Sequence, residues 1–285
     1  MEQDAAGARS LSFICFKVSV AITVPDHCDL EELALFLPPD RRIPTEGDID
    51  RSYSVVCTES DGEDAGPRYQ LFLHGRMLNE STELLEILAA WESDLSIAIA
   101  TDARHGYIFV HAGVVSIGGR GLVFPGESRS GKSTLLRALL ERGATYYSDE
   151  FAVFDDTGRV HPYARNPSFR GADRWAIGRK VAVESFGRCI GAGPLVVDGI
   201  LGCHFDSESG WGCPVVSPGR GAMLLLENAV AAQLYPERTL RVLSKAAGGC
   251  VVREGTRGEA GDAVGEILRS FNYELEARSA EESGV

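Results

Sequence analysis

The sequence predicts an α/β protein with a mixed sheet around a glycine-rich loop, preceded by an α+β region. A short apolar strand, the glycine-rich loop and an amphipathic helix follow one another between Gly121 and Gly143. Two apolar strands joined by a tight turn, instead of one isolated strand, lead into that loop. Before residue 105, apolar and polar residues alternate as in half-buried strands. We therefore expect an α+β region over residues 1–104 and the loop-containing domain over residues 105–285.

The composition is that of a globular chain with an acidic surface. The chain has 285 residues, of which 44% are hydrophobic, enough to bury a core in one large or two modest domains. Its net charge of −13 argues against a nucleic-acid groove and against anionic membrane surfaces. No apolar run reaches membrane-spanning length, and the acidic start lacks the basic region of a signal peptide. We expect a cytoplasmic protein without nucleic-acid or membrane partners, and leave a homo-oligomer open.

The cysteines do not form a recognisable framework. There are seven, an odd number, scattered along the chain without a C-x-x-C pair. This spacing indicates buried, reduced thiols and neither a disulfide framework nor a structural zinc site.

The opening region predicts a small antiparallel sheet and one helix. Residues 11–24 alternate as one long strand, and shorter strands are expected over 53–57 and 69–74. Ser81 or Thr82 is expected to cap the helix that follows. Its apolar face repeats at helical spacing, with Leu84, Ile87, Leu88, Trp91 and Leu95. Since no catalytic constellation precedes residue 105, this region is expected to pack, to position a partner or to mediate assembly.

The glycine-rich loop runs from Gly126 to Ser133, and we call it the glycine loop. It matches the pattern G-x-x-x-x-G-K-S/T at every fixed position. Small residues let successive backbone N–H groups point at anionic oxygens, and Lys132 adds a positive charge. The hydroxyl of Ser133 is a hard oxygen ligand suited to Mg²⁺, and the helix that begins here directs its positive dipole end at the same anion. The motif predicts binding of a nucleoside triphosphate.

The residues expected to contact the nucleotide are consecutive in the chain. They are Gly126, Glu127, Ser128, Arg129, Ser130, Gly131, Lys132, Ser133 and Thr134.

The flanking segments predict the rest of the domain. Strands are expected over 107–117 and 121–125, and the loop helix carries its leucines at helical spacing up to Gly143. Ala222–Leu226 is predicted to be a buried strand, because it is a short apolar run. Helices are expected over 238–247 and 259–271.

Two adjacent acids, Asp149 and Glu150, lie between two strand-like stretches shortly after the loop helix. Carboxylates beside a phosphate loop can hold Mg²⁺ or accept the proton of a hydroxyl group. The alternative interpretation is an acidic turn at the end of a strand. Their closeness in sequence to the glycine loop favours the functional interpretation.

From His111 to about residue 230 the chain resembles the catalytic domain of the HPr kinase/phosphorylase family. Five landmarks keep the family's order along the chain. They are His111-Ala112-Gly113, the glycine loop, Asp149-Glu150, residues 176–178 with 185–187, and residues 214–220 with 224–227. The opening region is more similar to short relatives that are associated with peptide modification, such as kinases of lasso-peptide precursors.

The resemblance implies a mixed-sheet P-loop kinase domain with an ATP site of the phosphoenolpyruvate-carboxykinase type. The implied reaction transfers the γ-phosphate of ATP to a hydroxyl group, most often a serine of a peptide or protein, with Mg²⁺ as cofactor. The implied metal ligands are Ser133, Asp149, Glu150 and Asp173. The implied catalytic residues are Asp149 as general base, Glu150, His111 at the phosphate or paired with Asp149, and Arg220 at the transferred charge.

The chain departs from the family pattern at three positions. Glu150 stands where the family usually has Asp, and Asp173 stands where it usually has Glu, so each carboxylate moves by one methylene. Arg129 adds a charge within the loop. Two alternative functions stay open: a kinase for free serine or another small molecule, and a nucleotide-binding sensor with little turnover. The sequence does not decide between ATP and GTP, or whether phosphorolysis of a phosphoserine also occurs.

Overall fold

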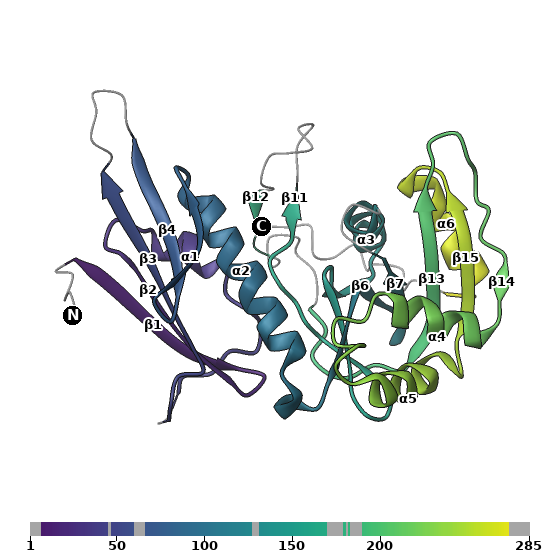
Figure 1. Ribbon diagram of the computed structural model, residues 1–285. Helices are drawn as coiled ribbons and strands as arrows, with labels where there is room; N and C mark the ends of the chain where they lie inside the picture. Colours follow the sequence, from purple (N-terminus) through teal and green to yellow (C-terminus); the bar gives the residue numbers. More distant parts are fainter. Residues whose placement is uncertain are drawn as a thin grey trace, which may run out of the picture. The chain divides into compact units, whose positions relative to one another are not determined.

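The computed structural model describes residues 7–44, 47–59, 66–126, 131–169, 179–180, 182 and 190–273. The protein is α/β with mixed sheets, which confirms the predicted class at that level. The described chain divides into two compact units (Figure 1). The first contains Met1–His105 together with Ser168–Val181, and the second contains Gly106–Pro167 together with Ala182–Val285. No helix among the described residues is both long and apolar enough to cross a membrane.

The first unit contains a five-stranded sheet with its strands in chain order. The strands are β1 (Ala8–Cys15), β2 (Val18–Pro25), β3 (Arg51–Glu59), β4 (Pro67–Leu73) and β5 (Arg76–Ser81). The predicted strands over 53–57 and 69–74 are thus confirmed as β3 and β4. The remaining strand pieces of this unit, β11 (Ser168–Phe169) and β12 (Arg179–Lys180), pair with each other.

The prediction of a single strand over 11–24 is wrong, because the chain turns back at Phe16 and Lys17. These two residues have φ angles of 48° and 66°, and they join β1 and β2 into an antiparallel hairpin. Positive φ at both central residues is the geometry of a type I′ turn. Asn and Gly are the usual residues in such turns. Phe16 and Lys17 continue the alternation of apolar and polar residues of the two strands. The sequence pattern therefore does not indicate the turn.

The first sheet is mixed and not purely antiparallel as expected, because β2 and β3 run parallel. The chain between them contains the short helix α1 (Leu30–Ala34) and returns to the end from which β2 started. Helix α2 (Leu84–Thr101) confirms the predicted helix, and Trp91 on its buried face packs edge-on against Tyr53. Its N-cap is Glu83, and Ser81 accepts a hydrogen bond from the Glu83 amide at 3.0 Å.

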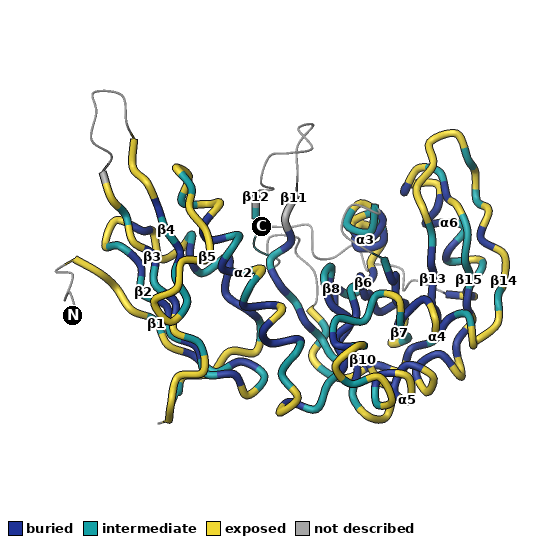
Figure 2. The backbone as a smooth tube through the Cα atoms, in the orientation of Figure 1, coloured by how far each residue is buried: buried dark blue, intermediate teal, exposed yellow. Residues whose placement is uncertain are grey.

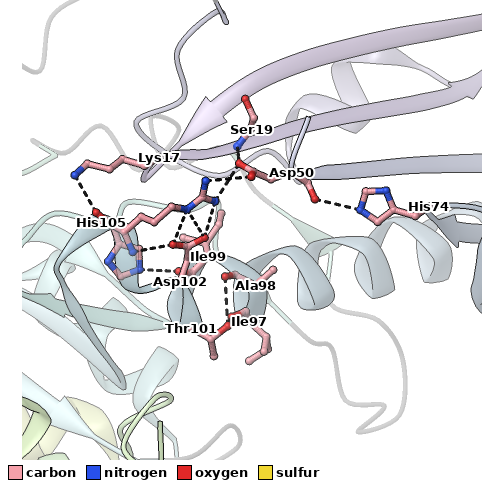
Figure 3. A network of polar contacts seen from close by, with 11 residues as sticks. Lys17, Ser19, Asp50, His74, Ile97, Ala98, Ile99, Thr101, Asp102 and His105 are labelled. Atoms are coloured by element: carbon pink, nitrogen blue, oxygen red, sulfur yellow. Dashed lines mark hydrogen bonds and ion pairs between the residues drawn. The ribbon is translucent and has the colours of Figure 1, made fainter. Parts of the chain in front are cut away.

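A polar network holds the end of the first unit, where α2 passes into the short helix η1 (Ala103–His105) (Figure 3). Arg104 donates to Asp102 from Nε and Nη2 and to Asp50 from Nη1. Asp50 also accepts from the Ser19 amide at 2.8 Å, while the Lys17 ammonium donates to the Arg104 carbonyl. The network thus connects the first hairpin, the segment before β3 and the end of α2.

The second unit contains an eight-stranded mixed sheet. Its strands are β6 (Ile108–Ile117), β7 (Arg120–Pro125), β8 (Thr145–Ser148), β9 (Phe151–Phe154), β10 (Val160–His161), β13 (Val197–Phe205), β14 (Val215–Val216) and β15 (Val251–Arg257). The path is β10-β9-β6-β7-β13-β15-β14, with β8 also paired to β6. The predicted hairpin before the glycine loop is confirmed as β6 and β7, and Gly118 and Gly119 form its turn with positive φ angles.

Helices cover both faces of this sheet (Figure 1). α3 (Lys132–Glu141) and α6 (Ala260–Ser270) pack on one face, where their apolar residues form a core with Phe124 and Leu201. α4 (Pro218–Glu227) and α5 (Pro236–Ala247) pack on the other face. Figure 2 shows the strands between these helices as mostly buried. α5 and α6 confirm the two helices predicted near the carboxyl end of the chain.

The prediction of a buried strand over Ala222–Leu226 is wrong, because this run is part of α4. Ser217 caps the helix by accepting a hydrogen bond from the Arg220 amide, and Pro218 occupies the first helical position. Serine followed by proline is a helix-start signal that outweighs a short apolar run. The side chains of Ala222, Leu224 and Leu225 are buried against the sheet.

Candidate active site

The glycine loop begins where β7 ends, at Pro125. The Gly126 amide donates to the His111 carbonyl at 3.1 Å, and the Lys132 ammonium donates to the Gly126 carbonyl at 2.6 Å. The expected nucleotide contacts Glu127, Ser128, Arg129 and Ser130 lie outside the described residues. Lys132, in the described end of the loop, therefore bonds back to the start of the loop.

Helix α3 starts immediately after Gly131, which has φ 84° and ψ 10° and serves as the N-cap. This left-handed conformation is accessible to glycine at no steric cost, which explains the residue type. Glycine has no side chain with which to cap the first helical amides, so these N–H groups face the loop. Ser133 is half-buried and Thr134 is exposed in the first turn of α3.

The two acids lie at the same edge of the sheet as the glycine loop. β7 and β8 both run antiparallel to β6, so they run parallel to each other and their carboxyl ends share one edge. The Ala112 amide on β6 donates to the Glu150 carbonyl at 3.0 Å, while Ala112 pairs with Pro125 on its other side. Glu150 and Pro125 are thus two strand spacings apart, about 10 Å. Strand β6 lies between them, so the two residues flank it on opposite sides.

Asp149 and Glu150 interrupt what would otherwise be one strand. β8 and β9 pair in sequence with the same strand, β6, and the register shifts between Val114 and Val115. The amides of Glu150 and Phe151 both donate hydrogen bonds to the Ser148 hydroxyl oxygen, at 3.2 and 3.0 Å. This small turn takes the two acidic residues out of the regular strand alternation.

A buried tyrosine contacts the first acid. The Tyr146 hydroxyl lies 3.0 Å from the Asp149 carboxylate and 2.9 Å from the Arg165 carbonyl, so its single O–H is shared between these two acceptors. Burial and then the nearby Asp149 charge raise the pKa of Tyr146 well above its usual value. The phenol therefore remains a proton donor at every physiological pH, which suits it to orient an ionised Asp149.

The second acid forms an ion pair with a buried arginine. The Arg165 guanidinium bonds the Glu150 carboxylate, and the arginine side chain is only 5% exposed while that of Glu150 is 39% exposed. A buried guanidinium is stable only when an anion and further acceptors compensate its lost hydration. No sequence pattern predicts this pair, because Arg165 follows Glu150 by fifteen residues and belongs to no motif.

His111 lies on β6 beside the start of the glycine loop. Its amide donates to the Asn228 carbonyl at 2.8 Å, its carbonyl accepts from Gly126, and its ring lies 4.8 Å from that of Phe151. The histidine is half-buried. It is therefore placed at the loop by its backbone and by ring packing next to the acidic turn.

Arg220 lies in the first turn of α4, on the face of the sheet opposite to α3. Its guanidinium makes a two-pronged contact with the Glu254 carboxylate, at 2.7 Å for each pair of atoms, and donates to Glu227 at 2.8 Å. These bonds raise the pKa of Arg220 and lower that of Glu254. The structure therefore engages Arg220 with two carboxylates and does not group it with the glycine loop and the acidic turn.

Asp173, the remaining expected metal ligand, lies outside the described residues. Among the residues that are described, no group of three or more His, Cys, Asp and Glu side chains converges as a metal site. The described oxygen donors near the loop are the Ser133 hydroxyl and the two carboxylates of Asp149 and Glu150.

Comparison with known proteins gives no independent assignment. No family model, no curated protein and no solved structure matches the chain. The chemistry must therefore be argued from the site, which combines a lysine, the N-terminus of α3 and two carboxylates at one sheet edge.

Proposed function

We propose that the chain is an ATP-dependent kinase that transfers the γ-phosphate to a hydroxyl group, with a serine of a peptide or protein as acceptor. One observation carries the proposal: the glycine loop and the Asp149-Glu150 turn lie at the same edge of one sheet, on parallel strands that flank β6. Ligands of α/β sheets bind outside the carboxyl ends of such strands. The matching loop motif and the resemblance to the HPr kinase family support the same chemistry.

In the proposed reaction the protein positions reactants and neutralises charge. Lys132 and the first amides of α3 hold the terminal phosphates of ATP. The acceptor oxygen forms a bond to the γ-phosphorus while the bond to the bridging oxygen of ADP breaks. Asp149 accepts the hydroxyl proton, and the Tyr146 hydroxyl orients its carboxylate. Glu150 is fixed through Arg165 and shapes the turn that presents Asp149.

Ser133 and Asp149 carry the kind of oxygen ligands that a magnesium ion prefers. Ser133 supplies a hydroxyl and Asp149 a carboxylate, and Mg²⁺ takes few protein oxygens because it keeps several waters. When bound, this ion would lower the negative charge on the phosphate oxygens during transfer.

The test is phosphoryl transfer with a matched variant. Purified protein is incubated with Mg²⁺ and γ-labelled ATP, with serine-containing peptides, with free serine, or without an acceptor. An Asp149→Asn variant, which keeps the size of the side chain but removes the carboxylate charge that serves as base and as metal ligand, runs beside each reaction. Because one general base contributes about 10²–10⁴-fold, the variant should transfer label at least about a hundred times more slowly.

Each outcome selects one function. Label on a peptide that is lost in the variant supports the proposal, whereas label on free serine alone would make the protein a small-molecule kinase. Tight ATP binding with no transfer, unchanged in the variant, would overturn the kinase in favour of a nucleotide sensor.

A further inference from the structure

Arg257 is a buried cation next to the described end of the glycine loop. It ends β15, and its side chain is among the largest of the fully buried ones, at 2% exposure. Among the described residues, no carboxylate lies within ion-pair distance of it. Its neighbours are the Phe205 ring, 5.5 Å from the guanidinium carbon, and the thiol of Cys203.

Two carbonyl groups accept hydrogen bonds from this guanidinium. Nη1 donates to the Gly258 carbonyl and Nη2 to the Gly131 carbonyl, each at 2.9 Å. Nε is buried and has no hydrogen-bond partner among the described residues. A buried guanidinium without a compensating anion is costly, so a bound anion nearby would stabilise it.

The Gly131 carbonyl is the first acceptor of α3. It accepts from the Leu135 amide at 3.2 Å as well as from Arg257. The carbonyl of Gly131 and the N–H of Lys132 belong to one trans peptide plane and point in opposite directions. Fixing the carbonyl toward the helix and Arg257 therefore fixes the Lys132 N–H toward the glycine loop, where a phosphate would bind.

We infer that Arg257 is a positioning residue of the glycine loop: it orients the Gly131–Lys132 peptide toward the phosphate and supplies a buried positive charge behind it. This inference rests on the proposed function, because the phosphate belongs to the nucleotide of that proposal. It adds a residue that no loop motif contains and that lies more than a hundred positions away in the chain. Gly131 also has to be glycine here, since a Cβ would lie 2.7 Å from Nη2 of Arg257.

Arg253 provides a matched control on the same strand. It also donates from Nη1 to a carbonyl, that of Cys213, at 2.8 Å, and its guanidinium lies 6.0 Å from the Phe271 ring. It precedes Arg257 by four residues, about 13 Å along the strand. Loss of Arg253 removes a partly buried arginine from the same strand without touching the loop.

The experiment compares Arg257→Met, Arg257→Lys and Arg253→Met with the unaltered protein. The first readout is the Kd of Mg·ADP by calorimetry, and the second is hydrogen–deuterium exchange of the first turn of α3 without nucleotide. Arg257→Met should weaken ADP binding about ten- to a hundredfold, because the Lys132 N–H would no longer be directed at the phosphate. This is the factor for losing one hydrogen bond to a charged group. It should also speed hydrogen–deuterium exchange at the Leu135 amide. This amide donates to the Gly131 carbonyl, which Arg257 would no longer hold in place.

Arg257→Lys keeps the charge but cannot bond both carbonyls, so we expect it to restore part of the ADP affinity and little of the exchange protection. Arg253→Met should change neither readout. If Arg257→Met binds ADP as the unaltered protein does and exchanges no faster, the inference is overturned while the proposed function stands. If the unaltered protein binds no nucleotide, the proposed function fails, and exchange alone decides whether Arg257 orients the loop.

Discussion

Two buried polar side chains hold the acidic turn, Asp149-Glu150, in its conformation. The Tyr146 hydroxyl is buried beside Asp149, and the Arg165 guanidinium is buried beside Glu150. Burying either group without a partner costs several kcal/mol, on the order of 2–7 for a hydroxyl. The cost is offset only while both carboxylates keep their positions, so these side chains make the turn rigid and pre-organise it for a reaction.

At Tyr146 we predict a catalytic effect without an effect on nucleotide binding. Tyr146→Phe removes the hydroxyl that orients Asp149, and kcat should fall about tenfold while the Kd of ATP stays the same. Tyr147→Phe is the control, because its hydroxyl lies by the backbone of Gly193. Steady-state kinetics and calorimetry on both variants make the comparison. A parallel rise in the Kd of ATP for Tyr146→Phe would contradict a role limited to Asp149.

Asp155 lies in the turn between β9 and β10, and its ionisation makes the stability of the fold depend on pH. Burial by itself would raise the pKa of Asp155, but bonds from the Thr157 hydroxyl, His161 and two backbone amides lower it to about 2. A depressed carboxylate pKa stabilises the fold above the unfolded pKa, near 3.8, and this contribution is lost as pH falls toward 2. The side chain is 24% exposed, so screening by solvent reduces the effect.

We predict that Asp155→Asn lowers the free energy of unfolding on the order of 1–2 kcal/mol at pH 6. The difference from the unaltered protein should shrink as pH falls from about 4 toward 2, because the carboxyl group of the unfolded chain is protonated near 3.8 while the native one keeps its charge down to about 2. Urea unfolding at a series of pH values measures it. A difference that stayed constant over this range would show that the charge of Asp155 does not contribute.

At the scale of elements, helix starts depend on single capping residues. α4 begins at Ser217 and Pro218, and the rest of its first turn carries Arg220, which is bonded to Glu254 and Glu227. The cap therefore stabilises the helix and also sets the direction of this arginine.

Ser217→Ala should cost about 1 kcal/mol of stability, since it removes the acceptor of the Arg220 amide. Ser217→Asp supplies another capping oxygen and a favourable charge at the helix start, so it should keep most of the stability. Urea denaturation of both variants separates the two. Equal losses would mean that the cap contributes nothing and that packing alone holds α4.

Local signals were sufficient for the elements next to the glycine loop. The hairpin of β6 and β7, the loop helix and the two helices near the carboxyl end follow from periodicity, glycine turns and chain order. Long-range pairing was not available from the sequence. That Ala112 lies between Pro125 and Glu150 depends on β8 returning to the far side of β6, and no residue pattern encodes that choice.

The residues missed at the site share one physical property. Tyr146, Arg165 and Arg257 are buried polar groups, and each has at least one partner that is distant in the sequence. No motif or spacing in the sequence distinguishes these residues from the other tyrosines and arginines of the chain. The turn at Phe16 and Lys17 was missed for a related reason, because tertiary contacts, including the packing of Phe16 on His105, compensate an unusual backbone conformation.

At the scale of the whole molecule, each compact unit has its own sheet and its own tryptophan packed against a core. Trp91 is fully buried on α2 of the first unit, while Trp211 packs against the core beneath α3 and α6 in the second unit. The remaining tryptophan, Trp175, lies outside the described residues. Replacing Trp175 by Phe, together with either Trp91 or Trp211, leaves a single reporter for one unit.

A ligand that binds only the folded second unit must stabilise that unit by mass action. With Mg·ADP at a hundred times its Kd, the stabilisation is about 2.7 kcal/mol, or roughly 5–10 °C in the unfolding midpoint of a domain this size. We therefore predict this shift in the transition reported by Trp211, and none in a Lys132→Ala variant.

The Trp91 reporter then shows how far the two units unfold as one. A shift of equal size at Trp91 would mean that both units unfold in one transition, whereas an unshifted Trp91 transition would mean that nucleotide stabilises the second unit alone. No shift at Trp211 with millimolar ADP or ATP would contradict nucleotide binding itself, whatever the acceptor.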